Sequence, residues 1–171
     1  MPAQTLDSCY LIEVEGTPTT LTLNSLTMGT RARIGLQLSD DSILSVYHHW
    51  DGYPSWLGRA LESHYNTKEK VAELIDGGDM STCWSDSVWG KKLPEGECAP
   101  EYYTARGEKL ENNAPRLDSS LVGYANKERG EEYHYVYREV AGEYTWVCID
   151  MNAFEDKDPE VVSIPSGYLA C

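Results

Sequence analysis

Two neighbouring segments alternate apolar and polar residues, and a short polar stretch joins them. Residues 30–38, TRARIGLQL, and residues 42–50, SILSVYHHW, lie on either side of SDD. Alternation with a period of two is typical of a strand with one buried side, and a polar tripeptide between two such strands favours a hairpin turn. This hairpin constrains the fold most, because its register decides which residues face the core.

The register follows from where apolar partners meet. If Leu38 pairs with Ser42 across residues 39–41, each apolar residue of the first strand faces an apolar residue or a histidine of the second. The pairs are Leu36 with Leu44, Ile34 with Val46, and Ala32 with His48. A shift of one residue would mix the two faces, so we expect this register alone.

The same register separates two adjacent histidines in the segment HHWDGYPSW, residues 48–56. His48 and Trp50 should point toward the core. His49 should lie on the other face, beside a tyrosine and two arginines: Tyr47, Arg31 and Arg33. The two rings should therefore have opposite environments.

A pair of helices should follow. Pro54 suits the first turn of a helix, and apolar residues then recur at helical spacing through residue 65. The second helix begins within residues 66–69 and stops at Gly77 and Gly78, a typical C-terminal signal. We expect this pair to pack on one face of the sheet.

The second half of the chain returns to strands after a less regular stretch. Residues 81–116 have no sustained period, and we interpret them as a long ordered loop with one short strand near EYYTA. Residues 118–130 favour a short helix. Residues 132–150 predict a hairpin that turns near Ala141 and Gly142 and pairs Tyr137 with Trp146 and Tyr135 with Cys148.

Together these elements predict one α+β domain over residues 1–171. Its twisted antiparallel sheet is built from hairpins, with the helical pair on one face. Residues 1–27 look like an N-terminal extension in which residues 9–23 could form two short strands. A length of 171 residues supports one core and gives no reason to expect two.

Charge and cysteine content narrow the function. The net charge of −14 repels phosphate backbones and anionic membranes, so we expect no direct binding of nucleic acid or membrane. The five cysteines are scattered without CxxC or zinc spacing, which favours reduced thiols in a cytoplasmic protein. No signal peptide or membrane-spanning run is present in the sequence.

The HHWDGYPSW corner holds the candidate binding residues. They are Arg31, Arg33, His49, Asp51, Tyr53 and Trp56. Three of them have a structural alternative. Asp51 could cap the following helix while Gly52 takes a positive φ, and Tyr53 and Trp56, with Trp50, could pack the helix against the sheet. A metal site from His49, Asp51 and His64 lacks any supporting motif, so we predict no metal, no cofactor and no catalytic residue.

Several motifs in order resemble a family. They are the run from residue 31 to residue 81 with HHWDGYP, SHY and GGDMS, then YYTARGE, then GEEYHYVYRE. This order resembles a group of small, largely uncharacterised proteins of tailed phages and bacterial genomes, over roughly residues 28–140. The resemblance implies a phage or prophage gene acting in a bacterial cytoplasm, and it implies no reaction. The extension over residues 1–27 and the loop from Cys83 to Cys98 depart from the pattern.

Two functions follow as hypotheses. The first is an acidic accessory protein that binds a host or phage protein without catalysis and inhibits a nucleic-acid-handling or anti-phage defence complex. The alternative is a small metal-assisted hydrolase or a nucleotide-binding protein that uses His49, Asp51 and the arginines around one pocket.

Overall fold

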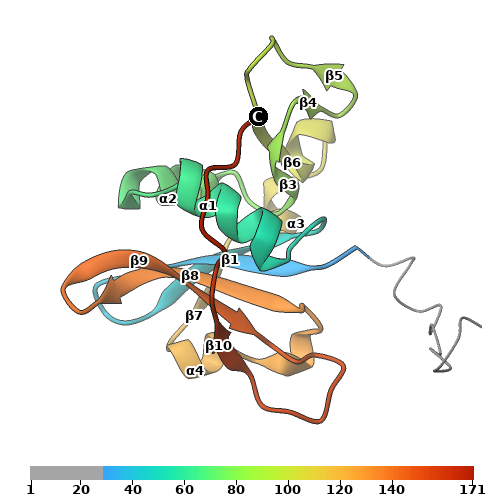
Figure 1. Cartoon of the computed structure of the whole chain (residues 1–171). Coiled ribbons are helices and arrows are strands. Elements are labelled where there is room, and N and C mark those ends of the chain that lie inside the picture. Colours follow the sequence, from blue (N-terminus) through green and yellow to red (C-terminus); the bar gives the residue numbers. More distant parts are fainter. Residues whose placement is uncertain (1–28) are drawn as a thin grey trace, which may run out of the picture.

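The computed structural model describes residues 29–171 (Figure 1). The expected extension, its two short strands and Cys9 lie outside the described residues. The strands are β1 (Ala32–Gln37), β2 (Ile43–His48), β3 (Met80–Ser85), β4 (Ser87–Val88), β5 (Lys91–Lys92), β6 (Ala99–Tyr102), β7 (Arg116–Asp118), β8 (Tyr133–Val140), β9 (Glu143–Asp150) and β10 (Glu160–Val162). The helices are η2 (Pro54–Gly58), α1 (Arg59–His64), α2 (Lys68–Asp76), η3 (Tyr103–Arg106), α3 (Leu110–Asn113), α4 (Leu121–Tyr124) and η4 (Lys127–Arg129).

One sheet carries most of the strands, in the order β10-β9-β8-β1-β2-β3-β6, and β7 pairs with β2. Strands β4 and β5 form a separate hairpin. The predicted α+β class is therefore confirmed.

The predicted register of the first hairpin is confirmed. The backbone N–H of Leu38 donates to the Ser42 carbonyl at 2.8 Å and closes the turn. The partners are Leu36 with Leu44, Ile34 with Val46, and Ala32 with His48. Apolar matching across the pair was therefore enough to set the register.

The second hairpin is also confirmed. Strands β8 and β9 pair Tyr137 with Trp146 and Tyr135 with Cys148. The turn residues Ala141 and Gly142 both have positive φ, 52° and 87°. Positive φ at both central residues is the backbone that a two-residue hairpin turn requires.

The two hairpins join in parallel, so the sheet is mixed. Strand β1 runs parallel to β8 and aligns Ile34 with Tyr135. The expectation of a wholly antiparallel sheet is wrong at this junction. Parallel neighbours need a long connection, and the segment between β2 and β8, with its helices and short strands, supplies it.

The helical pair covers one face of the sheet, as predicted. Figure 1 shows α1 and α2 on one side of the sheet, with α4 on the other. Leu57, Ala60 and Leu61 from η2 and α1 are fully buried, together with Val71 and Ile75 from α2. They pack against the apolar face of β1, β2, β8 and β9 in one cluster, which forms the main core.

Residues 81–116 do not form the predicted long loop. Strands β3 to β7, η3 and α3 occupy most of the segment. The short strand predicted near EYYTA overlaps the end of β6, and the remaining residues of EYYTA lie in η3. The other strands were not predicted, because they are short and carry no regular apolar pattern. Strand β3, for example, is MSTCWS, and it pairs with β2 only through Met80 and His48. Such a strand lacks the alternation on which the prediction rests.

The expectation of reduced thiols is wrong for two of the described cysteines. Cys98 and Cys171 form a disulfide with their Cα atoms 5.6 Å apart, while Cys83 and Cys148 are free and buried. The bridge ties the C-terminal tail to the loop before β6, 73 positions earlier in the chain. The spacing of these cysteines gave no sign of it, because such distant partners meet only in the fold.

Candidate functional site

The corner after β2 is built differently from the prediction. Asp51, and not Gly52, has the positive φ, at 54°. Gly52 is required by close packing instead, because a Cβ there would lie 2.7 Å from the Thr30 carbonyl and 2.8 Å from the Ala32 Cβ. The Gly52 N–H donates to the Thr30 carbonyl at 2.8 Å, which holds the corner against the start of β1.

Asp51 does not cap the following helix. Tyr53 is the N-cap residue of η2, and no side chain bonds the first turn. Asp51 is exposed at the corner, so its carboxylate remains accessible.

The two adjacent histidines do have opposite environments. His48 is fully buried, and its Nε2 accepts the backbone N–H of Cys83 at 3.0 Å. Burial lowers the pKa of His48 to about 3, so this ring stays neutral. His49 is half-buried, with its Nδ1 2.8 Å from the Tyr47 hydroxyl.

The prediction that Trp50 points to the core is wrong. Its side chain is 48% exposed, and its ring meets that of His49 edge to face at 4.5 Å. Strand alternation ends at His48, and the Trp50 backbone instead donates to the Ser81 carbonyl at 3.0 Å. Alternation therefore did not extend to Trp50, two residues beyond the end of the strand.

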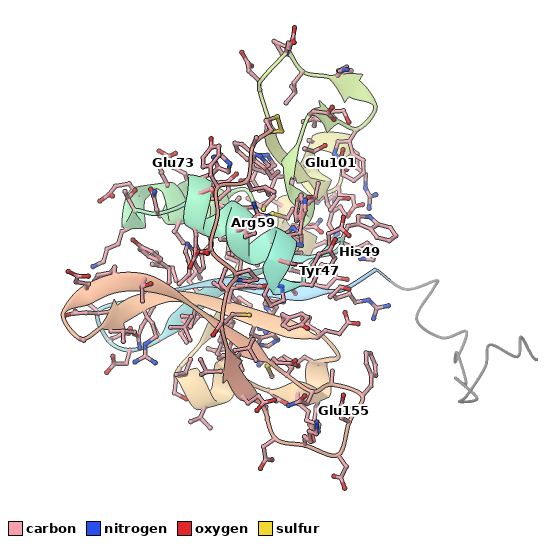
Figure 2. All side chains as sticks on the ribbon, in the orientation of Figure 1. Tyr47, His49, Arg59, Glu73, Glu101 and Glu155 are labelled. Carbon is pink, nitrogen blue, oxygen red and sulfur yellow. A yellow bond between two sulfur atoms is a disulfide. The ribbon has the colours of Figure 1, made fainter. Side chains whose placement is uncertain are left out.

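Tyr47 and His49 lie at the end of the sheet, near one another in Figure 2. The Tyr47 N–H donates to the Asp79 carboxylate at 2.7 Å, which fixes this end of β2. Partial burial lowers the pKa of His49, and the charges of Arg31 and Arg106 lower it further. Burial and the two nearby positive charges therefore favour the neutral form of the His49 ring.

Arg106 lies over two neighbouring aromatic rings, whose centroids are 6.1 Å apart. Its guanidinium carbon lies 4.6 Å from the ring centroid of Trp89 and 4.5 Å from that of Tyr103. Its Nε donates to the Glu108 carboxylate at 2.5 Å. The Tyr103 N–H donates to the Asp79 carbonyl at 3.1 Å, and Asp79 also bonds the Tyr47 N–H, so this stack lies beside Tyr47. Burial raises the pKa of Tyr103 to about 12.

These side chains form what we name the His49 surface. It consists of Arg31, Tyr47, His49, Trp50, Trp89, Tyr103 and Arg106. Sequence reasoning grouped Arg31, Tyr47 and His49, but it missed the last three residues. They lie in the segment interpreted as a loop, and nothing in their spacing indicated that the fold returns them to the end of β2.

The predicted neighbour Arg33 lies elsewhere. It is buried under the sheet, where its Nε donates to the Ser45 hydroxyl at 3.0 Å and its Nη1 lies 3.5 Å from the Glu131 carboxylate. Strand alternation places it on the expected face, but α4 and the segment around Glu131 cover that face. Arg33 therefore stabilises the fold and does not reach the His49 surface.

Tyr53 and Trp56 are also separated. Trp56 is half-buried against the core, with its ring 6.3 Å from that of His48. It therefore packs the helix against the sheet, which was the structural alternative to a binding role. Tyr53 is exposed and lines a different surface pocket, with Tyr133 and Phe154.

The suggested metal ligands do not meet. His64 stacks on Trp84 at 3.6 Å between centroids, and its Nε2 lies 2.6 Å from the Leu169 carbonyl. Within residues 29–171, no group of three or more His, Cys, Asp or Glu side chains is arranged to hold a metal ion. In the same range, no helix is both long and apolar enough to cross a membrane.

Comparisons with known proteins identify no relative. No protein-family model, no curated protein and no solved structure matches this chain. The resemblance to phage-type proteins therefore stays a prediction, and the His49 surface has to be interpreted from its own geometry.

Proposed function

We propose that the protein acts by binding another protein through the His49 surface, without catalysis. The observation that carries this proposal is the Arg106 guanidinium over the rings of Trp89 and Tyr103, on the same surface as the exposed ring of Trp50. Trp, Tyr and Arg are the residue types that dominate binding energy at protein interfaces. Their rings and guanidinium are already packed together, so little conformational freedom is lost on binding.

Charge indicates what this surface contacts. In a chain of net charge −14, Arg31 and Arg106 flank a neutral His49. A carboxylate of the partner placed between the arginines would gain two opposite charges and a histidine N–H. The acidic remainder of the surface would steer toward basic regions of the same partner.

The partner that we propose is a host protein in a bacterial cell infected by a phage. This setting comes from the phage-type motif order, and the acidic surface is suited to compete for a basic, nucleic-acid-handling or defence protein. By the same charge argument, the protein itself does not bind nucleic acid directly.

The Cys98–Cys171 disulfide bears on the proposal that the protein acts in the cytoplasm. Disulfides persist in oxidising compartments and are rare in cytosol. A cytoplasmic role therefore requires that the partner bind with the Cys98–Cys171 bridge open. Capture of the partner should be equal with and without dithiothreitol, whereas capture only by the oxidised protein would place the interaction in an oxidising compartment.

The test is affinity capture from host lysate with matched variants. We expect Trp50→Ala and Arg106→Ala each to weaken binding of the captured protein at least about thirtyfold, as for interface hot spots. The control is Val122→Ala, which truncates an apolar side chain that is 86% exposed on α4, on the other side of the sheet. Equal retention by all three variants would contradict the proposal.

A second candidate is a binding site for a small anion such as a nucleotide phosphate. The two arginines beside His49 favour it. Titration with inorganic phosphate should then raise the pKa of His49, which histidine NMR signals report directly. No change in the His49 titration would remove this candidate.

A further inference from the structure

The surface pocket that Tyr53 lines lies beside the corner, on the other side of β1 from His49. It has a volume of about 240 Å³ and is formed where β8 begins and β9 ends. Three aromatic rings line it, those of Tyr53, Tyr133 and Phe154. Three carboxylates line it too, those of Glu132, Asp150 and Glu155, the last of which Figure 2 marks in the loop after β9. We call it the Phe154 pocket.

The carboxylates of this pocket are held mostly by backbone groups. Glu132 accepts the Arg31 N–H at 2.5 Å, and Asp150 accepts the Asn152 N–H at 2.9 Å. Glu155 pairs with Lys157, which is exposed and is not among the lining residues. Among the described residues, those that line the pocket include no lysine or arginine.

The exposure of Phe154 favours a role in binding over a role in the core. It is the only phenylalanine of the chain, and it is 71% exposed at the rim of the pocket. A large exposed ring next to carboxylates offers a cation both a π face and a countercharge.

The chain already holds one arginine in such a set of groups. Arg106 lies over the rings of Trp89 and Tyr103 and bonds the Glu108 carboxylate. The Phe154 pocket repeats this combination of aromatic rings and acids without an arginine of its own. A planar guanidinium suits it better than an ammonium, because it can stack on a ring and bond a carboxylate at the same time.

We propose that the Phe154 pocket binds an arginine side chain of a partner protein. The pocket is smaller than the roughly 300–1,000 Å³ of sites for whole small molecules, so it fits the head of a side chain. An acidic protein also favours a basic partner. The proposal concerns a separate site and does not rest on the His49 surface.

The carboxyl of Glu132 provides a reporter at the site. Burial raises its pKa, and the charge of Asp150 adds to the rise, although Arg31 opposes it. A guanidinium in the pocket would lower this pKa, which side-chain carboxyl NMR signals detect.

The test is an NMR titration of the full chain with N-acetyl-arginine amide at constant ionic strength. We expect shifts confined to the pocket, with a dissociation constant on the order of 1–10 mM. N-acetyl-lysine amide should bind about two- to fivefold more weakly. A Gly-Arg-Gly peptide should bind at least as well as the amide, whereas free arginine, whose own carboxylate meets the acids, should bind more weakly. Tighter binding of free arginine would overturn the assignment to a protein side chain.

Two variants separate the rings from the charge. Phe154→Ala and Glu132→Gln should each weaken binding by about two- to fivefold. The matched controls are Tyr168→Ala, an exposed ring elsewhere, and Glu139→Gln, an exposed carboxylate at the far end of β8. Amide spectra of the free variants verify the fold. The proposal is overturned if arginine and lysine amides bind alike, or if Phe154→Ala binds as the unchanged protein does.

Discussion

The two faces of the sheet bury different kinds of side chain, mainly apolar on one face and largely charged on the other. On one face, the apolar side chains of β1, β2, β8 and β9 pack against α1 and α2 in a continuous core. On the other face, within residues 29–171, Ile43, Tyr124 and Val136 form a smaller buried cluster, with Leu121 and Val147 packed against it. Charged side chains are buried beside this cluster, among them Arg33, Asp118 and Glu131.

The charged groups of the second face form a network. Arg33 pairs with Glu131, and Glu131 lies 3.6 Å from the ring of His134. Arg129 bonds the Asp118 carboxylate through both Nη atoms, at 3.1 and 2.7 Å. Burial of such pairs contributes little net stability, but removing one member leaves a buried charge without its partner. The first face therefore supplies most of the stability, and the second is sensitive to single charge changes.

The largest effect is expected from truncation on the apolar face. Leu61→Ala should lower the free energy of unfolding by about 2–5 kcal/mol, because it removes buried methyl groups and leaves a cavity. Urea denaturation measures the loss. Val122→Ala, at an exposed apolar position, should change stability by less than about 0.5 kcal/mol. Similar losses in both variants would mean that α1 is not part of the core.

On the charged face, Glu131→Gln tests the network. It leaves the buried Arg33 guanidinium with only its Ser45 bonds, so we expect a loss of about 3 kcal/mol. Glu139→Gln makes the same chemical change at an exposed position of β8 and should be nearly neutral. Equal urea midpoints for the two variants would show that the network does not hold the second face.

Sequence reasoning predicted the two faces unequally. The hairpin registers and the buried residues of α1 and α2 followed from periodicity, because apolar burial repeats along strands and helices. The charged face did not follow, since Arg33, Asp118 and Glu131 come from separate segments whose meeting depends on the whole topology. Charged residues at alternate strand positions are normally interpreted as exposed, and here they are covered.

The residues of the candidate site also divide into those that the sequence predicted and those that it did not. His49, Tyr47 and Arg31 are neighbours in one hairpin, so alternation brought them together correctly. Trp89 lies in a turn and Arg106 ends the short helix η3, and no local pattern placed either residue. Arg33 was misplaced, because alternation gives the side of a strand and not what covers it.

Each face also buries one histidine, and both make stability depend on pH. Burial lowers the pKa of His48 to about 3, and it lowers that of His134 as well, although Glu131 opposes this shift. The unfolded rings take up protons below about pH 6.5, whereas the buried rings take them up only at lower pH, so stability falls with falling pH.

The expected loss for His48 is about 1.4 kcal/mol per pH unit below 6.5, or about 2 kcal/mol by pH 5. Urea midpoints between pH 5 and 8 measure it. His48→Gln keeps an acceptor for the Cys83 N–H and should flatten the profile more than His134→Gln, because Glu131 offsets part of the His134 shift. A profile that is flat in the unchanged protein would contradict the burial of both rings.

The smallest effects come from two matched hydroxyls, one on each face. Tyr124 donates to the Tyr135 carbonyl at 2.7 Å on the charged face, and Tyr135 donates to the Gly52 carbonyl at 2.8 Å on the apolar face. Tyr124→Phe and Tyr135→Phe should each lower stability by about 1 kcal/mol, because each removes one buried hydrogen bond and no packing volume.

Their local consequences should differ even where their stabilities agree. Tyr135→Phe releases the Gly52 carbonyl, so the Gly52 amide bonded to Thr30 should exchange with solvent faster, and the corner before Tyr53 should loosen. Tyr124→Phe should leave that exchange rate unchanged, since its hydroxyl acts on the opposite face. Equal acceleration in both variants would mean that the two faces respond as one unit, and that the apolar face does not by itself hold the corner between the two proposed binding surfaces.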